Sequence, residues 1–146
     1  MAIQFLDLRV SQHSNNDGFT TPIPTAPDSL TFGIIGVQTA GVSPENAGDI
    51  RVLLNGYVKV EGITATTETL TLRIFRDGIQ IFETSVGPLA AETGEVWGFS
   101  AADFPPDPSG GQLDYTVTIE SDLALSTAVI AAANFSGVAA AGAGVF

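Results

Sequence analysis

An alternating stretch with an Asp-Gly turn at its centre is the feature that most constrains the fold. Leu70, Leu72 and Ile74 alternate with polar residues, a period of two that places one set of side chains in a core and the other in water. Asp77-Gly78 follows, and β-branched and aromatic residues resume after it. Because an Asp-Gly pair supplies the positive φ of a tight hairpin turn, residues 69–84 are predicted to form a β-hairpin.

Further strand patterns lie on both sides of this hairpin, and no segment carries the pattern of an amphipathic helix. The predicted strands are 2–10, 30–40, 49–62, 95–101, 112–120 and 124–138. In the most regular of them, the odd-numbered residues 113–119 are expected to face inward and the even-numbered residues 114–120 outward. With the two hairpin strands, the pattern predicts an all-β, jelly-roll-like antiparallel β-sandwich of about eight strands; an immunoglobulin-like sandwich is the closest alternative.

The first strand is set apart from the others. Leu6, Leu8 and Val10 share one predicted face, with Asp7 and Arg9 on the opposite face. The segment that follows contains three prolines and a polar cluster, which favours an extended linker. A long unpatterned segment is uncommon inside a compact domain. The predicted divisions are a detached N-terminal strand (1–10), a flexible linker (11–29), a jelly-roll domain (30–138) and an Ala/Gly-rich tail (139–146).

Composition excludes several classes of function. The 146 residues suit one domain, and five basic against sixteen acidic residues give a net charge of −11, which disfavours nucleic acid and anionic membranes as partners. The absence of cysteine excludes disulfides and thiol nucleophiles. Met1 leads directly into an alternating segment, so no secretory signal is expected, and polar residues interrupt the Ala-rich end, so no membrane-spanning helix is expected.

No set of residues carries a convincing catalytic, cofactor-binding or metal-binding pattern. His13, the single histidine, lies among Ser and Asn residues and is expected to be a solvated loop residue. Asp103 and Asp107 flank a proline-rich loop and offer oxygen ligands for Ca²⁺, but they lack EF-hand spacing, so exposed loop acids are the favoured interpretation. We therefore expect no catalytic residue, no cofactor and no metal.

Two glutamate pairs were considered for glycoside hydrolysis. They are Glu92 with Glu95 and Glu61 with Glu68, and neither is accompanied by a cluster of aromatic residues that would stack on a sugar. The chain is accordingly not expected to be an enzyme.

Two other motifs have ordinary structural explanations. Trp97, Phe99 and Phe104 are either an exposed aromatic patch or, by default, core filling at the end of the sandwich. Asn134-Phe135-Ser136 matches a glycosylation acceptor, but it lies inside a predicted strand without a secretory signal.

Three blocks of the sequence resemble a known family. Arg51-Val-Leu-Leu-Asn-Gly, Leu72-Arg-Ile-Phe-Arg-Asp-Gly and Leu113-Asp-Tyr-Thr-Val-Thr-Ile-Glu resemble the small exosporium proteins on the spores of endospore-forming bacteria. The resemblance implies a jelly-roll domain similar to the C-terminal domain of the collagen-like exosporium glycoprotein, made without a signal peptide in the mother cell and assembled on the spore surface. The collagen-like repeat and the crosslinking cysteines of endospore-appendage pilins are missing.

Two functions follow as hypotheses. In the first, the chain is a structural, self-assembling subunit of an extracellular or spore-surface filament or layer, with copies of itself and other spore-surface proteins as partners. Its N-terminal strand would insert into a neighbouring sandwich as a donor strand, through the residues Ile3, Phe5, Leu6, Leu8 and Val10. In the alternative, residues 2–10 pair with their own domain, and loops 87–94 and 104–111 bind a carbohydrate or another ligand at the spore or cell surface.

Overall fold

The computed structural model of the chain describes residues 3–13, 21–64, 67–89, 95–105 and 111–142. The strands are β1 (Gln4–His13), β2 (Leu30–Gln38), β3 (Ile50–Glu61), β4 (Glu68–Arg76), β5 (Ile79–Leu89), β6 (Glu95–Asp103), β7 (Gln112–Ser121) and β8 (Val129–Ala141). A short 3-10 turn, η1 (Pro44–Asn46), lies between β2 and β3.

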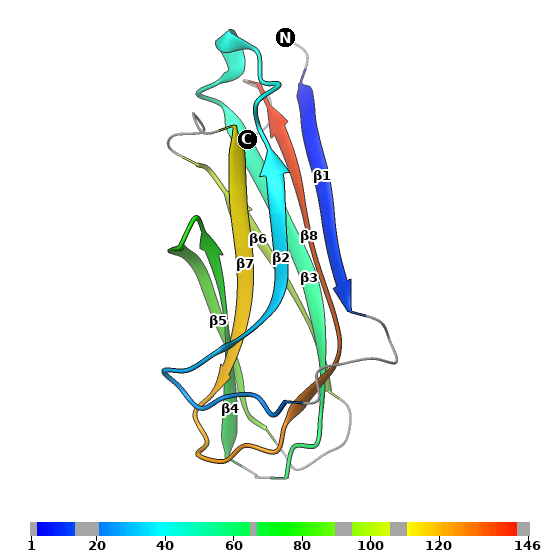
Figure 1. Cartoon of the computed structure of the whole chain (residues 1–146), viewed down its shortest axis with the longest axis vertical. Helices are drawn as coiled ribbons and strands as arrows, with labels where there is room; N and C mark the ends of the chain where they lie inside the picture. Colours follow the sequence, from blue (N-terminus) through cyan, green and yellow to red (C-terminus); the bar gives the residue numbers. More distant parts are fainter. Residues whose placement is uncertain (1–2, 14–20, 65–66, 90–94, 106–110, 143–146) are drawn as a thin grey trace.

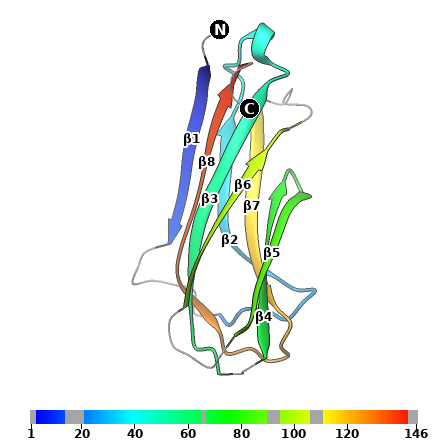
Figure 2. The same cartoon turned by 180° about the vertical axis from the view of Figure 1, so that it is seen from behind.

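The strands form two antiparallel sheets that pack face to face (Figures 1 and 2). Sheet A has the order β1-β8-β3-β6 and sheet B the order β2-β7-β4-β5. The first strand pairs with the last, the second with the seventh, the third with the sixth and the fourth with the fifth. This nested pairing is that of a jelly roll, so the predicted all-β sandwich is confirmed.

The predicted hairpin is confirmed in position, turn and facing. β4 and β5 are joined at Asp77 and Gly78, whose φ angles of 49° and 85° are those of a tight turn. Leu70, Leu72 and Ile74 are at most 2% exposed and belong to the core between the sheets.

The predicted facing of β7 is confirmed on its inner side and at the exposed Asp114, whereas the last two residues of its outer side are more buried than expected. The odd-numbered residues 113–119 are buried, but Thr118 and Glu120, which were expected to face solvent, are only 8% and 6% exposed. The reason is that β7 lies between β2 and β4 in sheet B, so neighbouring side chains cover its outer face. Arg73 on β4 forms an ion pair with Glu120.

The structure corrects the divisions expected at both ends of the chain. β1 is not detached: it pairs with β8 of the same chain from Gln4↔Ala141 to His13↔Ala133. Ile23, in the expected linker, is 1% exposed and belongs to the core. β8 continues past residue 138 because Ala139 and Ala141 fill the core at its end.

Candidate assembly surface

The outward side of sheet A carries five of the ten large hydrophobic side chains that are exposed in the described part of the chain. We call it the outer A face and define it by the residues that alternate with buried ones along each strand. They are Phe5, Leu8, Val10 and Gln12 on β1, Asn134, Ser136, Val138 and Ala140 on β8, Arg51, Leu53, Asn55, Tyr57, Lys59 and Glu61 on β3, and Val96, Gly98, Ser100 and Ala102 on β6.

An apolar row crosses all four strands of this face. Leu8 pairs with Val138, Val138 with Leu53, and Leu53 with Ala102. Leu8 and Leu53 are 54% and 49% exposed. Single exposed apolar residues are normal on a protein surface, whereas a contiguous apolar patch marks an interaction site.

By parity, the described residues of the outer A face include a single carboxylate, that of Glu61, although the chain has sixteen acidic residues. Its two cations are Arg51 and Lys59. Glu61 closes the face at the end of β3, where its Oε1 lies 3.3 Å from Lys59 Nζ. A face whose single acid is paired with a cation is the part of an acidic molecule that can approach a second copy with the least repulsion.

A groove opens at one end of the outer A face, where β3 begins and β6 and β8 end. Its volume is about 410 Å³, and it is lined by Arg51, Val52, Leu53, Ala102, Phe104, Val138 and Ala140. The guanidinium carbon of Arg51 lies 4.8 Å from the centre of the Phe104 ring, a cation–π contact. The groove therefore combines apolar walls with one positive charge.

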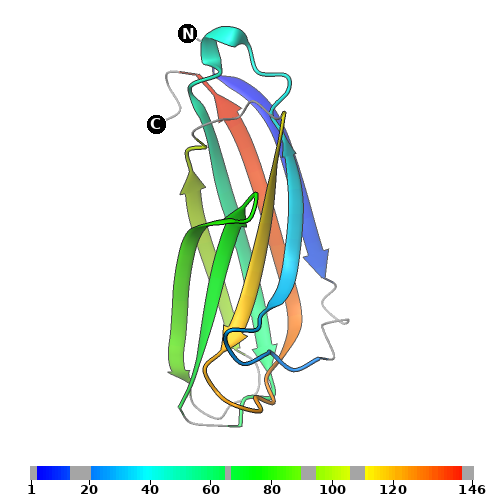
Figure 3. The same ribbon diagram turned by 60° about the vertical axis from the view of Figure 1, so that its left-hand side comes forward.

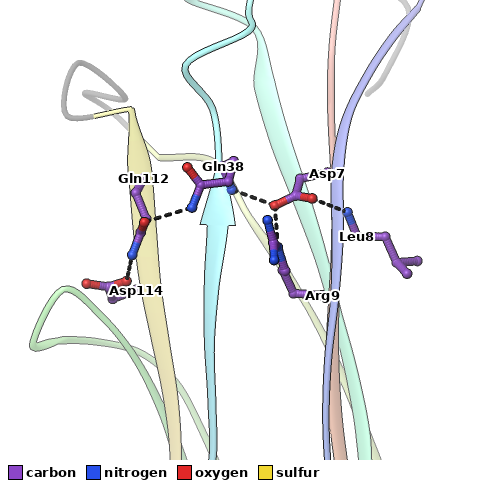
Figure 4. Close-up of polar contacts among 6 residues, drawn as sticks. All are labelled: Asp7, Leu8, Arg9, Gln38, Gln112 and Asp114. Carbon is purple, nitrogen blue, oxygen red and sulfur yellow. Dashed lines mark hydrogen bonds and ion pairs between the residues drawn. The ribbon is translucent and has the colours of Figure 1, made fainter.

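β1 is held to sheet B through the carboxylate of Asp7 (Figure 4). Asp7 Oδ2 accepts hydrogen bonds from the Gln38 backbone N–H and from Arg9 Nε, both at 2.8 Å, and Oδ1 accepts one from the Leu8 N–H at 2.9 Å. The hydrogen bond from Arg9 and then that from Gln38 lower the pKa of Asp7. Asp7 thus satisfies a backbone donor at the edge of sheet B.

A second group of contacts anchors the start of β1. Gln4 Nε2 donates to Gly41 O at 2.8 Å, and Gln4 Oε1 accepts from the Ser43 backbone N–H at 3.0 Å. Polar contacts therefore fix β1 at Gln4 and Asp7, in addition to its ladder with β8.

The structure places the predicted donor-strand residues mostly on the surface. Ile3, Phe5, Leu8 and Val10 are 54–65% exposed, and Leu6 alone packs against the core. The expectation that Leu6, Leu8 and Val10 share a face is wrong, because a β-bulge between Phe5 and Asp7 adds one residue and reverses the facing after it. Whether these residues contact a neighbour stays a prediction.

The loop acids and the histidine are placed as follows. Asp103 is not an exposed loop acid: it is 6% exposed, accepts a hydrogen bond from the Tyr115 hydroxyl at 2.7 Å and pairs with Arg76 at 2.5 Å. Burial, followed by the bond to Asp103, raises the pKa of Tyr115. His13 ends β1, but its side chain and residue Asp107 lie outside the described part. Among the described residues, no group of three or more His, Cys, Asp or Glu could hold a metal ion.

Glu68 is a buried carboxylate, which the sequence suggested only as a possible partner of Glu61. It is fully buried, and its Oε2 accepts hydrogen bonds from Ser121 Oγ at 2.6 Å and Ser126 Oγ at 2.5 Å. It is not half of a carboxylate pair, since Glu61 is bound to Lys59 at the surface. The sequence did contain a sign of its burial, because Glu68 lies two residues before the inward-facing Leu70 and therefore has the same facing in a strand.

The aromatic residues divide between core and surface. Trp97 and Phe99 pack against the core, and Phe99 meets Phe32 edge to face with ring centres 6.2 Å apart. Phe104 is 57% exposed. Asn134 lies within β8 and donates to Gln12 Oε1 at 3.2 Å. The expected binding loops fall largely outside the described residues, as does Glu92.

Comparison with known proteins supports the architecture. No protein-family model and no curated protein matches the sequence. Solved structures of viral capsids do match in fold. A chain of infectious bursal disease virus, Gt strain, is 11% identical with a TM-score of 0.55, over 97% of this chain and 34% of its own length. A chain of the T13 particle of that virus is 12% identical with a TM-score of 0.53, over 93% and 36%.

A third match is the D431N mutant VP2 protein of the same virus in T=1 particles. It is 10% identical with a TM-score of 0.54, over 92% of this chain and 36% of its own length. The chain thus spans about a third of the length of the proteins it matches. At this identity, the similarity defines the class of fold, a jelly-roll domain, and nothing of the function. In the described part of the chain, no helix has the length and apolarity needed to cross a membrane.

Proposed function

We propose that this chain is a structural subunit that assembles with copies of itself through the outer A face. The observation that carries the proposal is the apolar row across β1, β8, β3 and β6 on a face whose one carboxylate, that of Glu61, is paired with Lys59, in a chain with a net charge of −11. Full burial of a Leu or Val side chain contributes about 1.5 to 3 kcal/mol, and association costs about 4 to 15 kcal/mol in lost freedom. Several such side chains must therefore be buried together, as the row allows.

Exchange of β1 between neighbours is the finer part of the proposal. Leu6 is the one residue of β1 that packs against the core, so most of its attachment consists of the ladder with β8 and the contacts of Gln4 and Asp7. The same ladder would form with the β8 of a neighbour. Because Ile23 is fixed in the core, residues 14–22 would have to span the gap, which limits the reach to about 30 Å. Exchange is therefore proposed between subunits packed side by side.

The spore surface is the location that we propose, on the resemblance of the sequence motifs. Immunogold labelling of spores from the source organism tests it. Label confined to the cytoplasm of vegetative cells would contradict it.

Assembly itself is tested with the purified full chain by light scattering and negative-stain electron microscopy over a concentration series. We expect filaments or layers for the wild type. Leu53→Glu should prevent them, because it places a carboxylate in the centre of the apolar row. Ile34→Glu is the matched control, since Ile34 is 64% exposed on β2 of the other sheet. A wild type that stays monomeric, or equal loss of assembly in the two variants, would overturn the proposal.

A further inference from the structure

One leucine is displayed at the opposite end of the molecule from the groove. Leu125, in the connection between β7 and β8, is 92% exposed and has a φ of 61°. The left-handed region is uncommon for residues other than glycine, and a bulky side chain there is an outlier. Both the strained backbone and the exposed apolar side chain are unfavourable within one chain, a combination found at sites of function.

The loop that carries Leu125 is fixed on both sides. Ser121 and Ser126 both donate to the buried carboxylate of Glu68. Thr25 Oγ1 donates to Leu123 O at 2.8 Å, which ties the loop to the segment before β2. Leu125 is therefore presented in a set position, and association would lose little loop freedom.

The connection between β7 and β8, which carries Leu125, lies at the opposite end of the sandwich from the ends of β6 and β8, whose residues line the groove (Figures 1 and 3). β8 begins next to the Leu125 loop at Val129 and reaches the groove at Val138 and Ala140. Its 13 residues extend about 40 Å, so a chain cannot place Leu125 in its own groove. A second copy can do so, and the contact would join different surfaces of the two copies.

The charges beside the two features are complementary. The groove carries Arg51, one of only five basic residues in the chain. The Leu125 loop carries the exposed Asp122, whose Oδ1 accepts a hydrogen bond from the Thr69 backbone N–H at 2.8 Å. A second copy of this chain therefore supplies both an apolar anchor and a negative charge for the groove.

We infer that Leu125 of one copy inserts into the groove of the next, with Asp122 facing Arg51, to make a head-to-tail contact. The inference rests on the proposed self-assembly and names its lengthwise contact. Because the two surfaces differ, a row of joined copies keeps one unused groove at one end and one unused loop at the other, so it can grow at both ends.

The chain contains no cysteine, so single engineered cysteines give a direct test. Leu125→Cys and Ala102→Cys are made separately in the full chain, mixed under assembly conditions and oxidised. The disulfide requires Cβ atoms about 3.5 to 4.5 Å apart, so it reports close contact. We expect a covalent dimer in the mixture and none from either variant alone. A dimer from Ala102→Cys alone would show that like surfaces meet and would overturn the inference.

A second measurement uses the wild type and Leu125→Asn, which tolerates the left-handed backbone and removes the apolar side chain. Loss of one buried leucine should raise the concentration needed for assembly on the order of tenfold to a hundredfold. If the wild type assembles and Leu125→Asn assembles at the same concentration, the head-to-tail contact is wrong and the proposed function stands. If the wild type does not assemble, both fall.

Discussion

Thr71 and Leu72 are neighbours in β4 that point to opposite sides of sheet B. Leu72 is 2% exposed in the core, while Thr71 is half-buried and shares a hydrogen bond of 2.9 Å with Ser85 Oγ. Leu72→Ala is expected to lower the free energy of unfolding by about 2 to 5 kcal/mol through lost burial and a cavity. Thr71→Ala should lower it by less than about 1 kcal/mol. Urea denaturation measures both, and equal shifts of midpoint would contradict the assigned facing.

Asp7 makes the attachment of β1 sensitive to acid. Its pKa is lowered in the folded chain from the ordinary value of 3.8, mainly by the hydrogen bonds from Arg9 and the Gln38 N–H. A lowered pKa means that its contribution to stability is fully present above about pH 3.8 and is lost as the pH falls through the folded value. Arg9 is the charged group in contact with the Asp7 carboxylate. The side chain of Gln38 donates to Gln112, and that of Gln112 donates to Asp114.

The measurement is the difference in melting temperature between the wild type and Asp7→Asn, followed from neutral to acid pH. Subtraction removes the effect of the other acids, which the two proteins share. We expect the wild type to be the more stable at neutral pH and the difference to shrink below about pH 3.8. A difference that does not change with pH would show that the Asp7 charge has no part in holding β1.

At the scale of strands, β1 is the element whose partner decides the mechanism of assembly. Val10 is paired with Ser136 of β8 in the single chain. The double variant Val10→Cys with Ser136→Cys, crosslinked with a short bismaleimide, is expected to give covalent multimers from assembled protein if β1 is exchanged. Protein kept monomeric by dilution should give an internal crosslink, a single chain carrying one reagent molecule, and no covalent multimers.

Internal crosslinks alone, from material that electron microscopy shows to be assembled, would contradict strand exchange. The control is Val10→Cys by itself, which lacks the partner cysteine on β8. In that outcome the outer A face and the head-to-tail contact would still account for assembly.

The strands could be predicted from the sequence because alternation is a local pattern. The outer A face could not be predicted, because its residues come from strands that are far apart along the chain. The hairpin and its core residues Leu72 and Ile74 follow from a period of two and an Asp-Gly turn. The bulge between Phe5 and Asp7 is fixed by pairing with β8, more than a hundred residues away. A local pattern contains no sign of that extra residue, so the sequence places Leu8 on the same face as Leu6, whereas the structure places it on the outer A face.

Burial of polar groups was missed for the same reason. Glu120 has the parity of a solvent-facing residue, and only the position of β7 between two other strands, with Arg73 beside it, makes its burial possible. Glu68 has inward parity, but the two serines that donate to its Oε2 come from the end of β7 and the connection after it. The jelly-roll pairing brings these segments together, and that pairing is a property of the whole chain.

At the scale of the whole molecule, the distribution of charge sets how copies approach one another. Most of the net charge of −11 is carried away from the outer A face, which has two cations, Arg51 and Lys59, and one carboxylate, Glu61. The acidic groups that repel two copies therefore lie mostly outside the contact surface, and they are farther from one another than the side chains that touch. Screening acts on such distances, since the Debye length is about 10 Å at 0.1 M salt.

Assembly should for this reason be faster at higher ionic strength. Raising NaCl from about 20 mM to about 300 mM shortens the Debye length from roughly 20 Å to below 10 Å and weakens the repulsion between copies. Apolar burial on the outer A face is not weakened by the same salt. Time-resolved light scattering at fixed protein concentration is expected to show a shorter lag and a steeper rise, with Leu53→Glu remaining unassembled throughout. Slower assembly at high salt would mean that ion pairs, the Arg51–Asp122 pair among them, outweigh the apolar row in bringing copies together.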